Sequence, residues 1–404
     1  MTAISTTATT RSAAPVLFPS LATIAGAYFA ARICFTFLFF QSNPQLGTIV
    51  SSASNMLLLL VAAFNSVGSA QAARSSPWRV PCFRWVAAFL GFSFCSLIWT
   101  QAISVPVAFA YWCGMAADVA IVLLLLQTGP LVEVATSMIQ GYVVGACFIA
   151  CVMWFSPTMQ DLRLGNDEFF SPNAIGFTCA FGIFLAEFLI VRSRSWRYPA
   201  IFLAVSMLRS LSKTTIIAFL LSQALLLIFS KSIRRRSKVL IVAAAGLVLA
   251  AFSGLIAAYY QVYTNVGNQA ETLTGRIGIW AFILDRALER PWFGHGFDSV
   301  WKVIPPFGFD QFETWHAHNE LLQQFYAYGV VGIVLLIGLY WSFYAQARRI
   351  LRPEHKTLFL ALIAFMVIRG LGDTERFDLS FPLWSITLLS LTLAAPQKQL
   401  QVKP

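Results

Sequence analysis

Residues 131–155 read LVEVATSMIQGYVVGACFIACVMWF and contain one charged side chain, Glu133. A helix needs about 20 predominantly apolar residues to cross about 30 Å of hydrocarbon, so this stretch is long enough to span a bilayer. The whole chain shares its character, because 58% of the 404 residues are hydrophobic and only 11% are charged. Such a composition is typical of membrane proteins. The sequence therefore predicts an all-α, polytopic membrane helix bundle.

Apolar runs of similar length recur along the chain, and together they predict about 12 transmembrane helices. We expect spans at 18–40, 47–65, 84–101, 106–127, 131–155, 172–191, 198–209, 213–230, 238–260, 320–345, 356–372 and 380–395. The run 198–209 is too short to cross a bilayer without tilt or local thinning. No polar stretch outside 261–318 is long enough for a core of its own. The chain 1–404 is thus expected to be a single transmembrane domain, with 261–318 as one large loop that contains short helices.

Basic residues predict the orientation of these spans. The two termini and the loops that follow even-numbered spans contain 18 of the 28 lysines and arginines, whereas the opposite face has nine and Arg32 lies within the first span. Because basic residues concentrate on the cytoplasmic side, both termini should be cytoplasmic and the loop 261–318 should be periplasmic.

The net charge of +11 is mostly a consequence of this topology. Nucleic-acid binding is not expected, because the chain has no basic soluble module to carry it. Of the 17 acidic residues, 13 fall on the predicted periplasmic face. We therefore expect the chemistry on that face, in and around the large loop.

Several stretches between about 209 and 376 carry a recognisable pattern. The large loop contains ETLTGRIGIWAFILDRALERPWFGHGFDSVW from 271 and FETWHAHNELLQQFYAYGVVG from 312, while LSKTT occupies 211–215 and IRGLGDTE occupies 368–375. The Thr-Gly-Arg followed by tryptophan, the ERPWFGHGF turn and the HAHN before a glycine-bearing span resemble the O-antigen ligase and polymerase superfamily. LSKTT and IRGLGDTE resemble most its exopolysaccharide-production branch. The first 170 residues match only as a hydrophobic pattern.

The resemblance implies a metal-independent membrane glycosyltransferase with a helix bundle of the GT-C type, located in a bacterial inner membrane and surrounded by membrane lipids. Its donor would be a glycan linked to undecaprenyl diphosphate. Its acceptor would be a hydroxyl of a second glycan or of lipid A-core. Such an enzyme would serve exopolysaccharide, O-antigen or lipopolysaccharide biosynthesis and would need no cofactor.

A diphosphate leaving group gathers negative charge in the transition state, so its site needs cations, and arginine is preferred because its fork meets two phosphate oxygens. Arg276 begins an amphipathic helix at about 275–290, where free N–H groups also favour an anion, and we predict a catalytic role for it. Arg209 and Lys213 break the positive-inside pattern and would share a face if one helix ran through both. The residues predicted to bind the donor diphosphate are Arg209, Lys213, Arg276 and Arg369.

A hydroxyl acceptor must lose a proton as it attacks, and histidine, with an unperturbed pKa of about 6.5, suits a base near neutrality. Of the four histidines, His355 is predicted to be cytoplasmic and His295 lies between two glycines in a turn. His318, followed by Asn319, matches the His-Asn pair of the family and is the predicted catalytic base or acceptor ligand. His316 has a supporting role and would point elsewhere, because two residues along a helix turn a side chain by about 200°.

Arg369, Asp373 and Glu375 return to the same face after the penultimate apolar run. Arg369 matches an arginine of the exopolysaccharide branch. These residues would complete the phosphate site or orient His318, unless they form only a structural salt bridge. Tryptophans of the large loop offer flat faces for sugar stacking, although tryptophan also concentrates at membrane interfaces. They are Trp280, Trp292, Trp301 and Trp315.

The sequence carries no signal for a bound metal or nucleotide. It has no glycine-rich phosphate loop after a strand, and no His-x-x-x-His or carboxylate cluster with metal-ligand spacing. We therefore expect a lipid-linked donor and no metal.

Two alternatives remain at this point. A transporter of lipid-linked oligosaccharides would also suit twelve spans, but carriers tend to have interrupted helices and ionisable groups near the midplane, whereas here the polar residues gather in one loop and at nearby span ends. The other alternative is an O-antigen ligase that joins O-antigen to lipid A-core, which uses the same donor chemistry as a polymerase.

Overall fold

The computed structural model describes residues 20–32, 34, 38–40, 43–67, 76–156, 163–165, 170–230, 234–251, 253–254, 273–299, 316–374 and 380–394. Every regular element in these ranges is a helix, which confirms the predicted all-α class. The α-helices are α1 (Leu21–Ala31), α3 (Pro44–Val67), α4 (Pro81–Cys95), α5 (Val105–Leu125), α6 (Leu131–Phe155), α7 (Pro172–Ile190), α8 (Arg197–Ser210), α9 (Lys213–Phe229), α10 (Arg235–Ala251), α12 (Leu273–Glu289), α14 (Glu320–Ala347), α15 (Pro353–Gly370) and α16 (Ser380–Leu393). Short 3-10 helices occupy Pro77–Arg79, Ser96–Ile98 and Arg194–Trp196.

Six of the described helices are long and apolar enough to cross a membrane, namely α3, α4 with the turn after it, α5, α6, α7 and α14. Shorter apolar helices are α1, α9 and the Phe381–Leu393 part of α16. Each of the twelve predicted spans overlaps a described helix, and the predicted span 131–155 coincides with α6. The protein is thus a multi-pass membrane protein, and its number of crossings stays a prediction.

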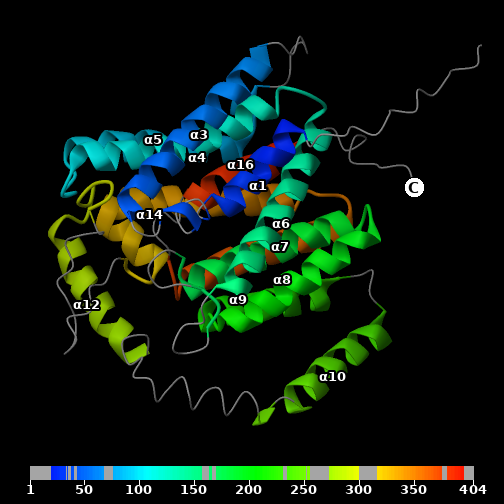
Figure 1. Cartoon of the computed structure of the whole chain (residues 1–404). Coiled ribbons are helices and arrows are strands. Elements are labelled where there is room, and N and C mark those ends of the chain that lie inside the picture. Colours follow the sequence, from blue (N-terminus) through cyan, green and yellow to red (C-terminus); the bar gives the residue numbers. More distant parts are fainter. Residues whose placement is uncertain are drawn as a thin grey trace, which may run out of the picture.

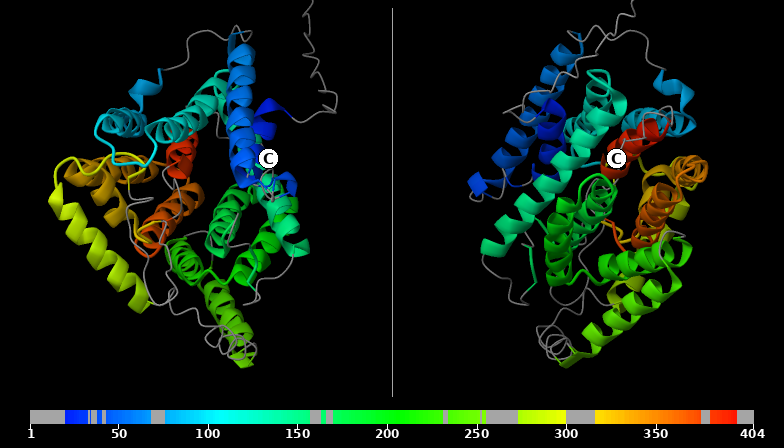
Figure 2. Two further views of the ribbon diagram at one scale, coloured as in Figure 1. Left: turned by 60° about the vertical axis from the view of Figure 1, so that its left-hand side comes forward. Right: turned by 90° about the vertical axis from the view of Figure 1, so that its right-hand side faces the viewer.

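Helix α6 lies in the middle of the bundle, between α1 and α7 (Figure 1). A Cβ atom on Gly26 of α1 would lie 2.0 Å from the carbonyl oxygen of Met138, and one on Gly141 of α6 would lie 2.0 Å from that of Thr23. No larger side chain fits there, so the two backbones approach closely, as is common where small residues line helix contacts in membranes. Helices α10 and α12 lie at the edge of the bundle in Figure 1 and in the left view of Figure 2.

Helix α14 is not the continuous rod that the predicted span 320–345 implied. Gly329 has φ 64° and ψ −155°, which breaks the helix after Tyr328. The phenolic oxygen of Tyr340 donates a hydrogen bond of 3.0 Å to Glu320, although the Cα atoms of these residues would be about 30 Å apart in a straight helix. The part of α14 before Gly329 therefore folds back along the part after it.

The ERPWFGHGF turn completes the hydrogen bonds that this break leaves open. In a continuous helix the N–H groups of residues 330 and 331 would donate to the carbonyls of residues 326 and 327. Here Val330 and Val331 donate to the carbonyls of Pro291 and Trp292, at 2.8 and 3.3 Å. The carbonyls of Tyr326 and Ala327 instead accept from the N–H groups of residues 295 and 296, at 2.9 and 2.8 Å. Four hydrogen bonds between the turn and α14 thus replace the two helical hydrogen bonds that the break removes. The turn is therefore bound to α14 at the break.

The contact between the turn and the break requires glycine. Gly294 and Gly329 both have positive φ, at 63° and 64°, which side chains rarely adopt. A Cβ atom on Gly329 would lie 2.4 Å from the carbonyl carbon of Trp292, and one on Gly294 would lie 2.5 Å from that of Ala327. The two backbones therefore touch directly, and this contact sets the direction of the short helix that follows His318.

Candidate functional site

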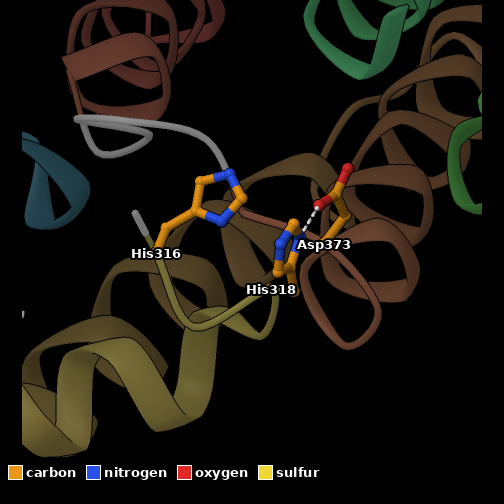
Figure 3. A group of neighbouring side chains, drawn as sticks. All are labelled: His316, His318 and Asp373. Carbon is orange, nitrogen blue, oxygen red and sulfur yellow. Dashed lines mark hydrogen bonds and ion pairs between the residues drawn. The ribbon is translucent and has the colours of Figure 1, made fainter. Parts of the chain in front are cut away.

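His318 and Asp373 form the centre of the candidate site (Figure 3). The Nδ1 atom of His318 lies 3.1 Å from Oδ1 of Asp373. His318 lies two residues before α14 and Asp373 lies three residues after α15, so the pair joins two segments that are far apart in the chain. His318 has φ 48°, an uncommon backbone conformation for a residue with a side chain, and such conformations concentrate at functional sites.

The Asp373 carboxylate is completely buried and lies between His318 and Arg369. The guanidinium of Arg369 is 3.7 Å from Oδ2 of Asp373 and lies over the ring of Phe177, 4.1 Å from its centroid. Burial alone would raise the pKa of Asp373, but the hydrogen bond to His318 and the charge of Arg369 outweigh it and hold this pKa below its ordinary value. Asp373 is therefore ionised at neutral pH and accepts the Nδ1–H proton of His318, which leaves Nε2 of His318 free to accept a proton.

His316 does not point away from His318, as a helical register would require. Residues 316–319 are not helical, and the two imidazole rings lie edge to face with centroids 4.0 Å apart. Burial, and after it the neighbouring His318, lower the pKa of His316 to about 3, so its ring is neutral near pH 7. The expectation of an isolated His316 is wrong because the chain turns at His318 before α14 begins.

A set of hydrogen bonds holds the histidine segment against α15. The side chain of Asn319 accepts from the N–H of Leu322 at 3.0 Å, as the N-cap of α14, and donates to the carbonyl of Leu371 at 2.9 Å. Gln323 accepts from the backbone N–H of residue 317 and from the hydroxyl of Thr374. The indole N–H of Trp280 donates to the carbonyl of residue 317 at 3.0 Å. Asn319 and Trp280 thus hold the histidine segment in place through hydrogen bonds.

Arg276 lies in the first turn of α12, where the sequence predicted an amphipathic helix. Its Nη1 group donates to the carbonyl oxygen of Gly372, the residue before Asp373, and lies 3.3 Å from the hydroxyl of Thr214. Its Nε group is buried and has no hydrogen-bond partner in the described part of the chain. The guanidinium is therefore adjacent to the His318–Asp373 pair and retains a donor that is not used within the described residues.

Arg209 and Lys213 do not share a helix face. Helix α8 ends at Ser210, Leu211 takes a left-handed conformation with φ 51°, and α9 begins at Lys213. The guanidinium of Arg209 lies over the ring of Trp154, 4.0 Å from its centroid. Lys213 is exposed at the start of α9, next to Thr214, which packs against Gly372. Lys213 therefore lies at the edge of the site, whereas Arg209 is held against α6.

The remaining sequence candidates are placed as follows. Glu375, Trp301 and Trp315 lie outside the described residues. Trp292, in the ERPWFGHGF turn, is 67% exposed. His295 is buried, with Nδ1 2.9 Å from the Gln101 side chain and Nε2 3.0 Å from the carbonyl of residue 286. Because both ring nitrogens are occupied, His295 is structural.

Among the described residues, His316, His318 and Asp373 could also hold a metal ion, since one ligand atom of each lies within 4.8 Å of the others. The sequence did not predict a group with metal-ligand geometry here, because 55 residues separate His318 from Asp373. Arg369 already provides a positive charge on the far side of Asp373, which disfavours a cation there. The arrangement suits a histidine base oriented by a carboxylate.

The fold and the site together describe a multi-pass membrane protein with a histidine, a carboxylate and arginines where α9, α12, α14 and α15 meet. Residues 198–337 match the family model Wzy_C, described as O-Antigen ligase. The chain is also 23% identical, over 324 residues and 72% of each chain, to the exopolysaccharide production protein ExoQ of Rhizobium meliloti (strain 1021).

These matches confirm the resemblance inferred from the motifs: the chain is similar to proteins of the O-antigen ligase and polymerase superfamily. They support a membrane polymerase or ligase of polysaccharide biosynthesis. The range of the family model includes Arg276 and His318 but ends before Arg369 and Asp373. The association of Asp373 with the site therefore rests on the structure.

Proposed function

We propose that this protein is a glycosyltransferase that moves a glycan from undecaprenyl diphosphate to a hydroxyl acceptor at the periplasmic face, in exopolysaccharide or O-antigen biosynthesis. The observation that carries this proposal is the pairing of His318 with the buried carboxylate of Asp373, next to Arg276. The site thus combines a base with a cation, the two groups that such a transfer needs.

In this mechanism His318 is the base. Asp373 holds the Nδ1–H of His318, so that Nε2 accepts the proton of the acceptor hydroxyl as its oxygen attacks the anomeric carbon. The bond between that carbon and the diphosphate oxygen breaks, and the configuration inverts if the attack is direct. Arg369 lies behind Asp373 and is buried, so we assign it a positioning role for the carboxylate.

The diphosphate that leaves is negatively charged, and Arg276 is the residue placed to meet it. It lies near the N-terminus of α12, where helix N–H groups also attract an anion. Lys213, exposed at the start of α9, would add a second positive charge. Arg209 would reach the donor only if it leaves the ring of Trp154. No metal is required in this scheme, because the leaving group is stabilised by arginine and lysine.

An apolar groove supports a donor with a long hydrocarbon chain. It has a volume of about 330 Å³ and lies between α14 and α15, lined among others by Leu336, Ile337, Ile363 and Val367. One end is formed by Glu320, Gly370 and Leu371, and the Asn319 side chain binds the carbonyl of Leu371. A polyprenyl chain attached to a diphosphate at Arg276 would therefore find an apolar path beside the site.

Two acceptors are compatible with this chemistry. The similarity to a protein of exopolysaccharide production favours a polymerase, which extends a second lipid-linked glycan. The description of the matched family favours a ligase, which transfers the finished glycan to lipid A-core. Both reactions release undecaprenyl diphosphate, so they differ only in the acceptor.

The test uses the purified full-length protein in liposomes with a labelled oligosaccharide on undecaprenyl diphosphate. We expect released undecaprenyl diphosphate together with either longer lipid-linked glycans or labelled lipid A-core, depending on which acceptor is present. Activity should persist in the presence of EDTA. Movement of the labelled lipid across the bilayer without bond formation would instead support a transporter, and loss of activity with EDTA would contradict the metal-independent mechanism.

A further inference from the structure

A second cavity lies at the other end of α15 from the His318–Asp373 pair. Its volume is about 560 Å³. It is bounded by the start of α4, the end of α14, the start of α15 and the end of α16. By the distribution of basic residues, this is the end of the bundle predicted to face the cytoplasm.

The cavity is lined by the cationic side chains of Arg79, Arg349 and Arg352, together with His355. No carboxylate occurs among the described residues that line it. Burial, and after it the charge of Arg352, lower the pKa of His355, whereas the neighbouring Glu354 raises it. The positive-inside rule explains why arginines lie on this face, but it does not explain why three of them surround one cavity.

Two helices also begin at this cavity. Helix α4 starts at Pro81 and α15 at Pro353, and neither has a side-chain hydrogen bond at its N-cap. Val80, Pro81 and Arg352, which form these helix starts, line the cavity. The N-terminal end of a helix carries partial positive charge and free N–H groups, so both helices add to the attraction for an anion.

The lining also offers an acceptor and an aromatic ring. Gln346 donates from Nε2 to the carbonyl of Ser390, and its buried Oε1 atom has no hydrogen-bond partner among the described residues. The ligand that fits these groups best therefore carries a negatively charged phosphate and a hydroxyl or amine that can donate a hydrogen bond to Gln346. Trp341 is 65% exposed at the same cavity, a residue type that favours the headgroup level of a bilayer.

We propose that this cavity binds the headgroup of an anionic phospholipid, with its phosphodiester at Arg349 and Arg352 and a headgroup hydroxyl at Gln346. The location favours a lipid over a soluble phosphate compound, because the cavity lies at the ends of apolar helices of a membrane protein. The exposed side chain of Leu351, which lines this cavity, offers an apolar surface for an acyl chain. Basic pockets between transmembrane helices on the cytoplasmic side are known to bind phospholipid headgroups.

The experiment measures thermal stability and lipid retention of the full-length protein in nanodiscs of phosphatidylcholine with increasing phosphatidylglycerol. We expect phosphatidylglycerol to raise the melting temperature and to remain bound in native mass spectra. The double variant Arg349→Ala with Arg352→Ala should need about 10- to 30-fold more phosphatidylglycerol for the same shift, since each arginine near a membrane surface contributes about a fivefold effect. In pure phosphatidylcholine its melting temperature should equal that of the wild type, because both arginines are exposed.

The matched control is Arg236→Ala with Arg348→Ala, which removes the same charge from the same predicted face but lies outside the cavity lining. This control should respond to phosphatidylglycerol like the wild type. Equal loss in both double variants would show that only the general surface charge matters and would overturn the proposal. A shift of the same size with inorganic phosphate in phosphatidylcholine nanodiscs would overturn the assignment to a lipid.

Discussion

The Nδ1 atom of His318 lies 3.1 Å from the Oδ1 atom of Asp373, and the two residues come from segments 55 positions apart. The carboxylate is completely buried, whereas the side chain of His318 is 15% exposed. A buried carboxylate that holds one nitrogen of a partly exposed imidazole leaves the other nitrogen available to a substrate. We therefore expect His318 and Asp373 to act together as the base, which single and double variants can test.

His318→Ala should lower turnover by at least about 100-fold and change donor affinity little, because a positioned base typically contributes about 10²- to 10⁴-fold. Asp373→Asn should approach the same loss. If the two residues act as a unit, the double variant should lose about as much as His318→Ala alone. Glycan transfer and donor binding are measured on each variant, and multiplied losses in the double variant would show that Asp373 acts independently of His318.

Arg276→Ala should abolish most activity with normal membrane insertion, and Arg276→Lys should recover only part of it, because lysine lacks the planar fork that meets two phosphate oxygens. Arg286→Ala is the matched control on the same helix, where Arg286 forms an exposed pair with Glu289 at 2.8 Å. Such exposed pairs contribute little, so this variant should behave like the wild type. Full activity of Arg276→Lys would show that only a point charge is needed.

Gly329→Ala should destabilise the protein by about 1–3 kcal/mol or more, because its Cβ atom would meet the backbone of Trp292 and its φ is positive. Gly278→Ala on α12 is the control, since a Cβ atom there meets nothing within 4 Å and alanine favours a helix. Thermal unfolding in one detergent compares the two variants. Equal melting temperatures would mean that the contact of the ERPWFGHGF turn with α14 is not needed for stability.

The sequence predicted the apolar helices well and their interruptions poorly. The span 131–155 coincides with α6 because continuous apolar character extends over its whole length. The break at Gly329 was missed because the apolar pattern continues through it. The hydrogen bonds that complete the break come from the ERPWFGHGF turn, which is distant in the sequence. His318 was predicted from its motif, but its pairing with Asp373 depends on how α14 and α15 pack.

His316 should make stability depend on pH in the acidic range. Its pKa is lowered to about 3 in the folded protein, whereas an unfolded histidine has a pKa of about 6.5. Between these values the unfolded chain binds more protons, so the stability of the folded protein falls as pH is lowered from 6.5 towards 3. His316→Gln should flatten this dependence of the melting temperature. An unchanged slope would show that His316 is protonated in the folded protein at these pH values.

The groove between α14 and α15 should matter for long-chain donors only. Val367→Trp fills the groove that Val367 lines, so it should raise the KM for an undecaprenyl donor by about tenfold and leave kcat unchanged, as expected when binding common to ground and transition state is lost. A donor with two prenyl units should be used equally well by wild type and variant. Val334→Trp is the control. Val334 lies on α14 and is exposed, as Val367 on α15 is, but it does not line the groove. If Val367→Trp raises the KM for both donors equally, the groove does not hold the polyprenyl chain, while transfer itself would still support the glycosyltransferase.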